Sequence, residues 1–227
     1  MFVFLIAYRA RGEHAFRRNE IIRMMKNIHT YFGKHQLEYK IVICEQYNDA
    51  KFNRGVLMNA AFNLSLQLNL VLSKFIHFNI DYEFNLDVDF PDEIRYFTNG
   101  FLELFKPPYP VLGSACVFDG ESYINCNGFP NDLYGWGGDD WAIYNRIVHL
   151  NLPIHKTRLL NSGFIHEFDP DHIRDMTNNA HNMELAKRND IKTNGLSTCV
   201  FDIAGNGEFH NGANIFHYLI TSPLFRG

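Results

Sequence analysis

Apolar and amphipathic stretches alternate along the first third of the chain. Residues 2–8 are almost continuously apolar, which is typical of a strand covered on both faces, and residues 39–45 repeat the pattern. Residues 13–32 and 56–66 instead place apolar side chains at helical spacing. This order of strand and helix predicts βαβ units and therefore an α/β fold.

The rest of the chain continues the alternation with shorter elements. The expected elements are a strand-like run at 75–90, a helix at 94–105, strands at 111–118 and 152–156, a helix at 140–150, a loop with a ragged helix at 167–189, and strands at 196–203 and 213–221. No repeat, linker or low-complexity tract separates them, so we expect a single domain over residues 1–227.

Composition narrows the class of protein. The formal net charge of −4 argues against broad nucleic-acid binding, which requires a basic face. The four cysteines form no Cys-x-x-Cys pair and suit a reducing compartment. The apolar run at 2–8 is too short to span a membrane, and no basic leader precedes it. These features predict a cytoplasmic chain without a targeting or membrane segment.

An acidic pair ends the strand-like run at 75–90. Asp87 and Asp89 are two residues apart, so on a strand both side chains would point the same way. Like charges held that close repel each other, and a divalent cation relieves the repulsion. The oxygen ligands suit Mg²⁺ or Mn²⁺. The structural alternative is an acidic turn before Pro91.

Two basic segments follow predicted strands. Arg9 and Arg11 come directly after the strand at 2–8, where they could clamp phosphates or form a solvated turn. Phe52 and Arg54 precede the helix at 56–66 and could stack a base and hold a phosphate, or simply start the helix. His166 ends a short apolar run, and as a ligand it would favour Mn²⁺ over Mg²⁺.

Residues 127–141 read NGFPNDLYGWGGDDW and combine four glycines with aromatic and acidic side chains. Trp136 stands among the glycines, and Asp139 and Asp140 follow at once. We interpret the segment as a mobile glycine loop that delivers two acids to a helix N-terminus, where the helix dipole favours negative charge. A surface turn with an acidic cap is the structural alternative.

The chain resembles the β-1,4-galactosyltransferase family over nearly its whole length. The motifs that carry the resemblance are, in order, AYRARGEH, FNRG, LDVDF, NGFPNDLYGWGGDD, a histidine at 166 and NGLSTCVFDI. The resemblance implies a GT-A type fold, which is a Rossmann-like nucleotide-sugar-binding domain with a mixed, mostly parallel sheet. It implies inverting transfer of a hexose or N-acetylhexosamine from a UDP-sugar to a glycan hydroxyl, with Mn²⁺ on the diphosphate. No nucleic acid takes part.

The resemblance also implies a role for each site residue. The family's nucleotide-sugar-binding positions fall on Arg9, Arg11, Phe52, Arg54, Asp87, Trp136 and Gly138. Its metal-binding positions fall on Asp89 and His166. Its acidic pair, which holds the sugars, falls on Asp139 and Asp140, with Asp140 as the catalytic base.

The sequence departs from the family at several positions. Asp139 replaces the usual Glu, Trp141 replaces the usual following Asp, and Val111 aligns near a Tyr that crowds the sugar's C2 position. A smaller side chain there would admit an N-acetyl group, so UDP-GalNAc or UDP-GlcNAc joins UDP-Gal as an expected donor. Typical members are Golgi type II membrane proteins, which makes an excised lumenal domain the alternative to a cytoplasmic chain.

Two other functions use the same features. A nucleotidyl or sugar-phosphate transferase would need the paired aspartates and the arginines but not Trp136 or Asp140. A carbohydrate-binding module without catalysis would use Trp136, Tyr134 and Trp141 as a stacking platform. Sugar binding that requires neither metal nor nucleotide would favour the module.

Overall fold

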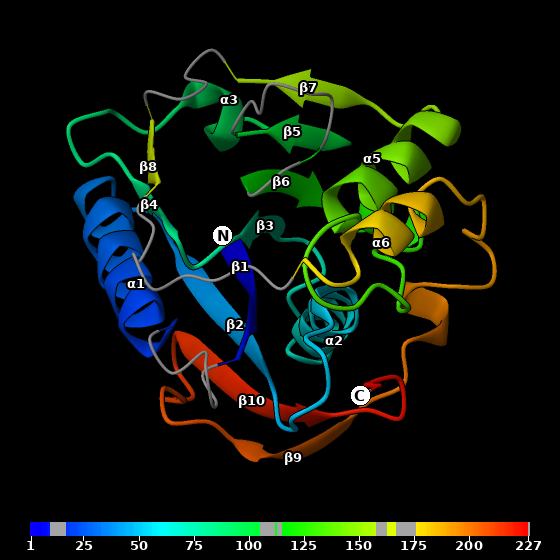
Figure 1. Ribbon diagram of the computed structural model, residues 1–227. Helices are drawn as coiled ribbons and strands as arrows, with labels where there is room; N and C mark the ends of the chain where they lie inside the picture. Colours follow the sequence, from blue (N-terminus) through cyan, green and yellow to red (C-terminus); the bar gives the residue numbers. More distant parts are fainter. Residues whose placement is uncertain (10–16, 105–111, 113–114, 158–162, 167–175, 227) are drawn as a thin grey trace.

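The computed structural model describes residues 1–9, 17–104, 112, 115–157, 163–166 and 176–226, and an eight-stranded sheet runs through them (Figure 1). The strand order is β7-β5-β6-β3-β1-β2-β10-β9, and a second sheet pairs β4 with β8. The strands are β1 (Phe2–Tyr8), β2 (Tyr39–Gln46), β3 (Lys74–Phe78), β4 (Tyr82–Phe84), β5 (Phe101–Glu103), β6 (Ala115–Asp119), β7 (Ile154–Lys156), β8 (Phe164–His166), β9 (Asp202–Asn206) and β10 (Ile215–Thr221).

The centre of the large sheet is parallel. β1 pairs with β2 on one side and with β3 on the other, and β10 continues the parallel set beyond β2. β6 and β9 pair antiparallel at the two borders of this set. The expected α/β architecture with a mixed, mostly parallel sheet is therefore confirmed.

Helices cover both faces of the sheet. Figure 1 shows α1 on one face and α2 on the other. The helices are α1 (Arg17–Lys34), α2 (Arg54–Gln67), α3 (Asp92–Arg95), α4 (Gly120–Asn125), α5 (Asp139–His149) and α6 (Asn179–Leu185), with a 3₁₀ turn, η2, at Leu196–Thr198. Within the described part of the chain, none of them combines the length and apolarity needed to cross a bilayer.

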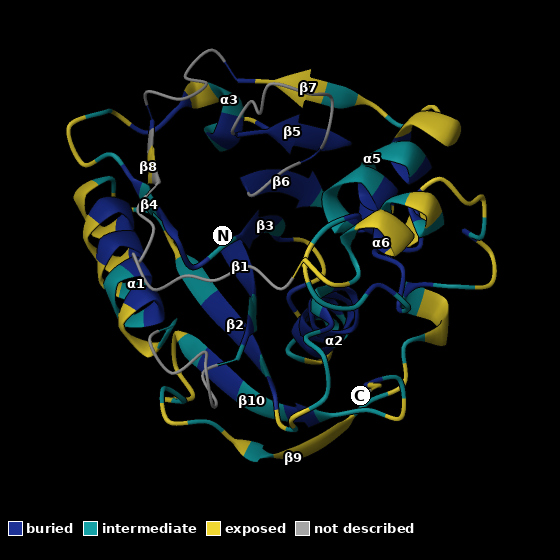
Figure 2. Cartoon of the chain, in the orientation of Figure 1, coloured by how far each residue is buried: buried dark blue, intermediate teal, exposed yellow. Residues whose placement is uncertain are grey.

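The alternation of side chains along β1 produces two separate apolar cores. Val3 and Leu5 face α2, whereas Phe4 and Ile6 face α1, and all four are fully buried. Figure 2 shows the result, with the inner strands and the inward sides of both helices buried. A continuous apolar strand therefore sits between two helical layers, as its sequence predicts.

The strand-like run expected at 75–90 is wrong in its extent. β3 ends at Phe78, the chain turns at residues 79–81, and β4 runs back along α1. The Phe84 ring stacks on Phe78 at 5.1 Å and on Tyr31 of α1 at 4.7 Å. Aromatic packing therefore holds β4 against α1, and the polar turn at 79–81 interrupts what reads as one apolar run.

Two further elements differ from the expectation. The helix expected at 94–105 is only the single turn α3, after which residues 101–103 form β5. The strand expected at 196–203 begins instead as the 3₁₀ turn η2, and the strand is shifted to β9. In both places the apolar pattern of a short segment fits a helix as well as a strand. Pairing with a neighbouring strand determines which of the two forms.

Two helical glycines allow a matched test of this packing. A Cβ on Gly55, in α2, would lie 2.0 Å from the carbonyl oxygen of Pro130, whereas a Cβ on Gly33, in α1, would meet nothing within 4 Å. We expect Gly55→Ala to lower the free energy of unfolding by about 1–3 kcal/mol, because the backbone of residue 130 must move. Gly33→Ala should raise it by about 0.5–1 kcal/mol through helix propensity. Urea unfolding of both variants checks this; equal effects would contradict it.

Candidate active site

The two helices α2 and α5 begin close together, near the carboxyl ends of β1 and β3. α2 starts at Arg54, with the Asn53 side chain accepting the Val56 N–H at 2.9 Å. α5 starts at Asp139 after Gly138, whose φ of +86° is one that glycine adopts without strain. The predicted acidic start of a helix directly after the glycine loop is therefore confirmed.

Arg54 joins the two helix starts by ion pairs. Its Nη1 lies 2.9 Å from Oδ2 of Asp139, and its Nη2 lies 2.5 Å from Oδ1 of Asp140. The three side chains are 15%, 16% and 28% exposed, so the pairs are largely shielded from water. The guanidinium also lies over the Phe129 ring, 5.7 Å from its centre. The structure therefore places Arg54 first of all beside the acidic pair.

The charges in this cluster shift the pKa of its members. Burial raises the pKa of Asp140 to about 6; Arg54 opposes the shift, and Asp139 adds to it. Burial also disfavours the charged guanidinium, but the two carboxylates outweigh it and raise the pKa of Arg54. A carboxylate with a pKa near 6 is ionised at neutral pH yet basic enough to accept a proton, which suits a general base.

The NGFPN part of the motif anchors the loop to α2. Asn59, fully buried in α2, donates to the carbonyl of Phe129 at 2.8 Å, and its Oδ1 accepts from the Phe129 N–H at 3.1 Å. Asn53 donates to the carbonyl of Asn131 at 2.7 Å. The segment therefore supports the acidic pair through backbone contacts.

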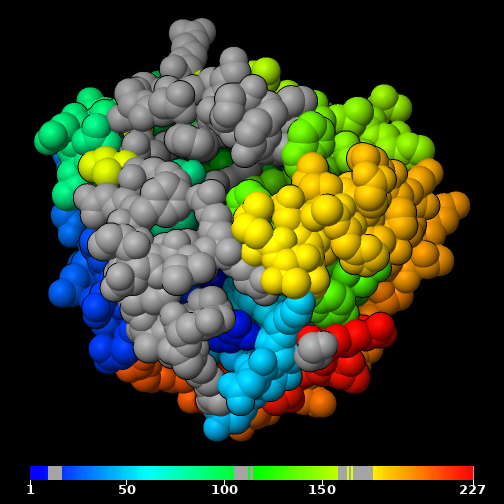
Figure 3. All heavy atoms as spheres, viewed as in Figure 1, coloured from blue at the N-terminus to red at the C-terminus, as the bar shows by residue number. Residues whose placement is uncertain are grey.

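The glycine loop itself packs against α6. The carbonyl of Tyr134 accepts from Asn182 at 2.9 Å and from Asn178 at 3.3 Å. A Cβ on Gly138 would lie 2.6 Å from the carbonyl oxygen of Asn182, so the close approach requires glycine. Trp136 is 38% exposed at the tip of the loop. Figure 3 shows the α6 surface beside the segment that precedes α2.

Trp141, which stands where the family has an acid, contributes to packing. It lies against a small apolar cluster formed by Leu133, Ala142 and Ala186, beside Leu185 of α6. Trp141 therefore takes part in the packing of α5 against the end of α6.

Arg9 and Phe52 also come together at the end of β1. The Arg9 guanidinium lies 5.8 Å from the centre of the Phe52 ring and donates to the carbonyl of Ala50. Gln46, fully buried, donates to the carbonyls of Ala50 and Lys51 and accepts from the Asn53 N–H at 2.9 Å. The hydrogen bonds of the buried Gln46 side chain therefore hold the loop that carries Phe52. Arg11 and Val111 lie outside the described residues.

Asp87 and Asp89 do not join this site. They follow β4, which has run back towards the other end of the sheet, and both are exposed. Lys34, the last residue of α1, donates to the carbonyl of Leu86 at 2.8 Å, and Phe90 packs on Phe2 at the start of β1. The expectation that this pair ends a strand beside the other site residues is therefore wrong, because the strand ends earlier.

Asp81 occupies the place that sequence reasoning gave to Asp89. It follows β3 by three residues, is 7% exposed, and its charge acts on both Arg54 and Asp140. The backbone of His166 lies opposite Tyr82, the next residue, in the β4–β8 ladder. The signal in the sequence is the polar pair Asn79 and Asp81, which comes directly after β3.

Asp81 offers a buried carboxylate, and carboxylate oxygen is a ligand type that Mn²⁺ accepts. Within the described part of the chain, no three His, Cys, Asp or Glu side chains gather as a complete metal site.

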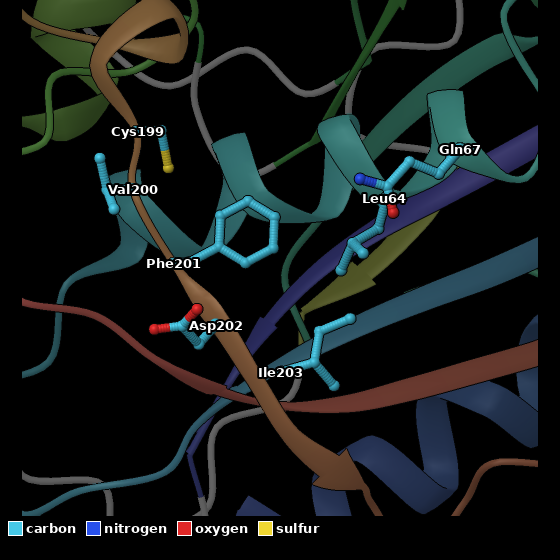
Figure 4. Close-up of a pocket in the computed structure, with 7 residues that line it drawn as sticks. All are labelled: Leu64, Gln67, Cys199, Val200, Phe201, Asp202 and Ile203. Carbon is cyan, nitrogen blue, oxygen red and sulfur yellow. The ribbon is translucent and has the colours of Figure 1, made fainter.

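A hollow in the described surface lies away from these residues. Its volume is about 460 Å³, and the C-terminal end of α2 and the chain leading into β9 line it (Figure 4). The lining residues are Leu64, Gln67, Cys199, Val200, Phe201, Asp202 and Ile203. None of the candidate site residues borders it.

Comparisons with known proteins identify two family models and several relatives of the chain. A model described as the N-terminal region of glycosyl transferase group 7 matches residues 2–86, and one described as the N-terminal domain of galactosyltransferase matches residues 101–169. Beta-1,4-galactosyltransferase 1 of Mus musculus is 28% identical over 169 residues, which are 67% of this chain and 38% of the relative. Beta-1,4-galactosyltransferase 3 of Homo sapiens is 28% identical over 140 residues, 59% of this chain and 35% of the relative. The chain thus spans less than two fifths of these relatives.

Among solved structures, the catalytic domain of Drosophila beta1,4-galactosyltransferase 7 in complex with xylobiose superposes with a TM-score of 0.76 at 19% identity, covering 97% of this chain and 94% of that one. A mutant of that enzyme in complex with manganese, UDP-Gal and xylobiose gives the same TM-score at 18% identity, with the same coverage. The expected GT-A type fold is confirmed. By its matched models, its relatives and its fold, the chain belongs to the β-1,4-galactosyltransferase family.

Proposed function

We propose that the chain is a metal-dependent, inverting glycosyltransferase that moves a hexose or N-acetylhexosamine from a UDP-sugar to a hydroxyl of a glycan acceptor. The observation that carries the proposal is the largely buried Asp139–Arg54–Asp140 cluster beneath the glycine loop, on which the charge of Asp81 also acts. Relatives named as galactosyltransferases, and a structural neighbour crystallised with manganese and UDP-Gal, support it.

In this proposal Asp140 is the catalytic base. It takes the proton from the acceptor hydroxyl as that oxygen attacks the anomeric carbon, and the bond to UDP breaks with its electron pair on the diphosphate oxygen. Arg54 keeps Asp140 ionised at neutral pH despite its burial. Trp136 and the glycine loop would exclude water from the reacting centre, which suppresses hydrolysis of the donor.

The donor would lie across the ends of β1 and β3. Phe52 offers a face for the uracil ring, and Arg9 beside it offers a guanidinium for phosphate. Asp81 and His166 would hold Mn²⁺, with Asp81 replacing Asp89 in the assignment made from sequence. When bound, Mn²⁺ would offset the negative charge that develops on the leaving diphosphate.

The assignment of Asp81 has a matched control in Asp89. With Mn²⁺ present, UDP release is measured from a panel of UDP-sugars with and without simple sugar acceptors, and again with Mg²⁺ or a chelator. We expect Asp81→Asn to reduce metal-dependent release by about 100-fold or more, as for loss of a metal ligand. Asp89→Asn should stay within about twofold of the wild type, because the side chain is exposed at the other end of the sheet. A large loss of release in Asp89→Asn together with a small one in Asp81→Asn would instead support Asp89 as the metal ligand, as predicted from sequence.

The base assignment predicts a pH profile. A base must be deprotonated, so kcat should fall as pH drops through about 6, the pKa of Asp140. Asp140→Asn should abolish transfer, while calorimetry still detects binding of UDP with Mn²⁺. Transfer that survives this substitution would show that another group is the base.

The same shift predicts how stability depends on pH. The folded-state pKa of Asp140, about 6, lies above the usual value of 3.8 for an aspartate, so between these values the folded state binds more protons than the unfolded state. The contribution of protonated Asp140 to the free energy of unfolding is therefore complete at low pH and is lost as pH rises through 6. Relative to Asp140→Asn, the wild type should lose unfolding free energy between about pH 4 and pH 6. A constant difference in urea unfolding across this window would contradict the shift.

A further inference from the structure

One buried titratable group beside the acidic cluster has no part in the mechanism above. His77 lies within β3, is 1% exposed, and stands among the buried apolar residues Phe75, Ile76 and Phe78. Its Nε2 lies 3.2 Å from Nη2 of Arg54, the same nitrogen that contacts Asp140. The histidine therefore touches the cation that holds the proposed base.

The chemistry of this contact fixes the state of the imidazole. A guanidinium has only donors, so Nε2 of His77 must accept, and the proton of the neutral ring stands on Nδ1. Burial and the Arg54 charge lower the pKa of His77 well below its usual value, whereas the Asn79 side chain acts in the opposite direction. The geometry and the charge both require a neutral ring.

Arg54 is enclosed by contacts of different kinds. The carboxylates of Asp139 and Asp140 reach it from α5, the Phe129 ring lies against it, and His77 reaches it from the sheet. His77 also meets the Phe129 ring edge-on, at 5.5 Å between centres and 86° between planes. Through His77, the guanidinium of Arg54 therefore contacts β3, a strand in the middle of the sheet.

We propose that His77 is a positioning residue: a neutral acceptor that fixes Arg54 against the acidic pair and so holds Asp140 in the ionised state that a base requires. The proposal rests on the proposed function for Asp140. The charged and titratable groups that face Asp140 are Arg54 from α2, Asp139 from α5, Asp81 from the turn after β3, and the Cys116 thiol from β6. His77 acts on Asp140 only through the first of them.

The test compares three variants. His77→Phe keeps an aromatic ring against Phe129 but removes the acceptor, so Arg54 should pair less well with Asp140. We expect the acidic limb of the pH profile of kcat to move to higher pH by about one unit. At a fixed pH on this limb, kcat would then fall about tenfold. KM for the UDP-sugar should change less than kcat. His77→Gln, which restores an acceptor, should recover most of the effect.

His217→Phe is the control for replacing a buried histidine. His217 is fully buried in β10, where its Nε2 lies 3.0 Å from a carboxylate oxygen of Glu45, and the strands β1 and β2 separate β10 from β3. We expect this variant to lose stability without moving the limb. A limb that shifts equally in both Phe variants, or that stays in place in His77→Phe, would overturn the proposal.

Two measurements remain decisive if no transfer activity is found. Nitrogen NMR shifts of His77 in the wild type should report a neutral ring with the proton on Nδ1 at pH 7. The carboxyl titration of Asp140, followed by carbon NMR, should move to higher pH in His77→Phe and return in His77→Gln. An imidazolium, a proton on Nε2, or an unchanged Asp140 titration would refute the role of His77 independently of the reaction.

Discussion

The site depends on one constraint: two adjacent carboxylates must stay ionised where water is largely excluded. Asp139 and Asp140 repel each other, and burial disfavours the charge on Asp140. The N-terminus of α5 helps through its dipole, but this effect is small compared with a full charge. Arg54 supplies the charge, and it does so from the first residue of another helix. The position of α2 relative to α5 is therefore an electrostatic requirement of the site as well as a matter of packing.

Much of the scaffold serves that relative position. Gly55 lets α2 approach the backbone of Pro130, and the Asn59 amide ties the same helix to Phe129. On the other side of the loop, the buried Arg146 of α5 donates to the carbonyls of Asn127 and Gly128 at 3.2 and 2.9 Å. The NGFPN segment is thus held by both helices, which explains why a string of residues that need not touch substrate accompanies the acids in the sequence.

The sequence predicted the parts of the fold that follow from local pattern. The buried strands, α1, α2 and the acidic start of α5 all have periodicity or turn chemistry that belongs to one structure. The reversal after Phe78 could not be predicted in this way, because the aromatic residues Tyr82 and Phe84 of β4 continue the pattern of β3. Only the packing of β4 on α1 shows that the chain turns back. This single reversal moved the candidate metal ligand from Asp89 to Asp81. Likewise, His77 reads as a polar interruption until Arg54 is seen beside it.

The contacts between α6 and the glycine loop differ in kind from the ion pairs of the Asp139–Arg54–Asp140 cluster beneath the loop. The contacts to the Tyr134 carbonyl come from asparagine amides, and the close approach at Gly138 is steric. Neutral hydrogen bonds of this kind are not screened by dissolved ions. Ionic strength therefore acts on the exposed charges of the molecule, whereas the asparagine contacts that hold the loop should stay the same from dilute buffer to concentrated salt.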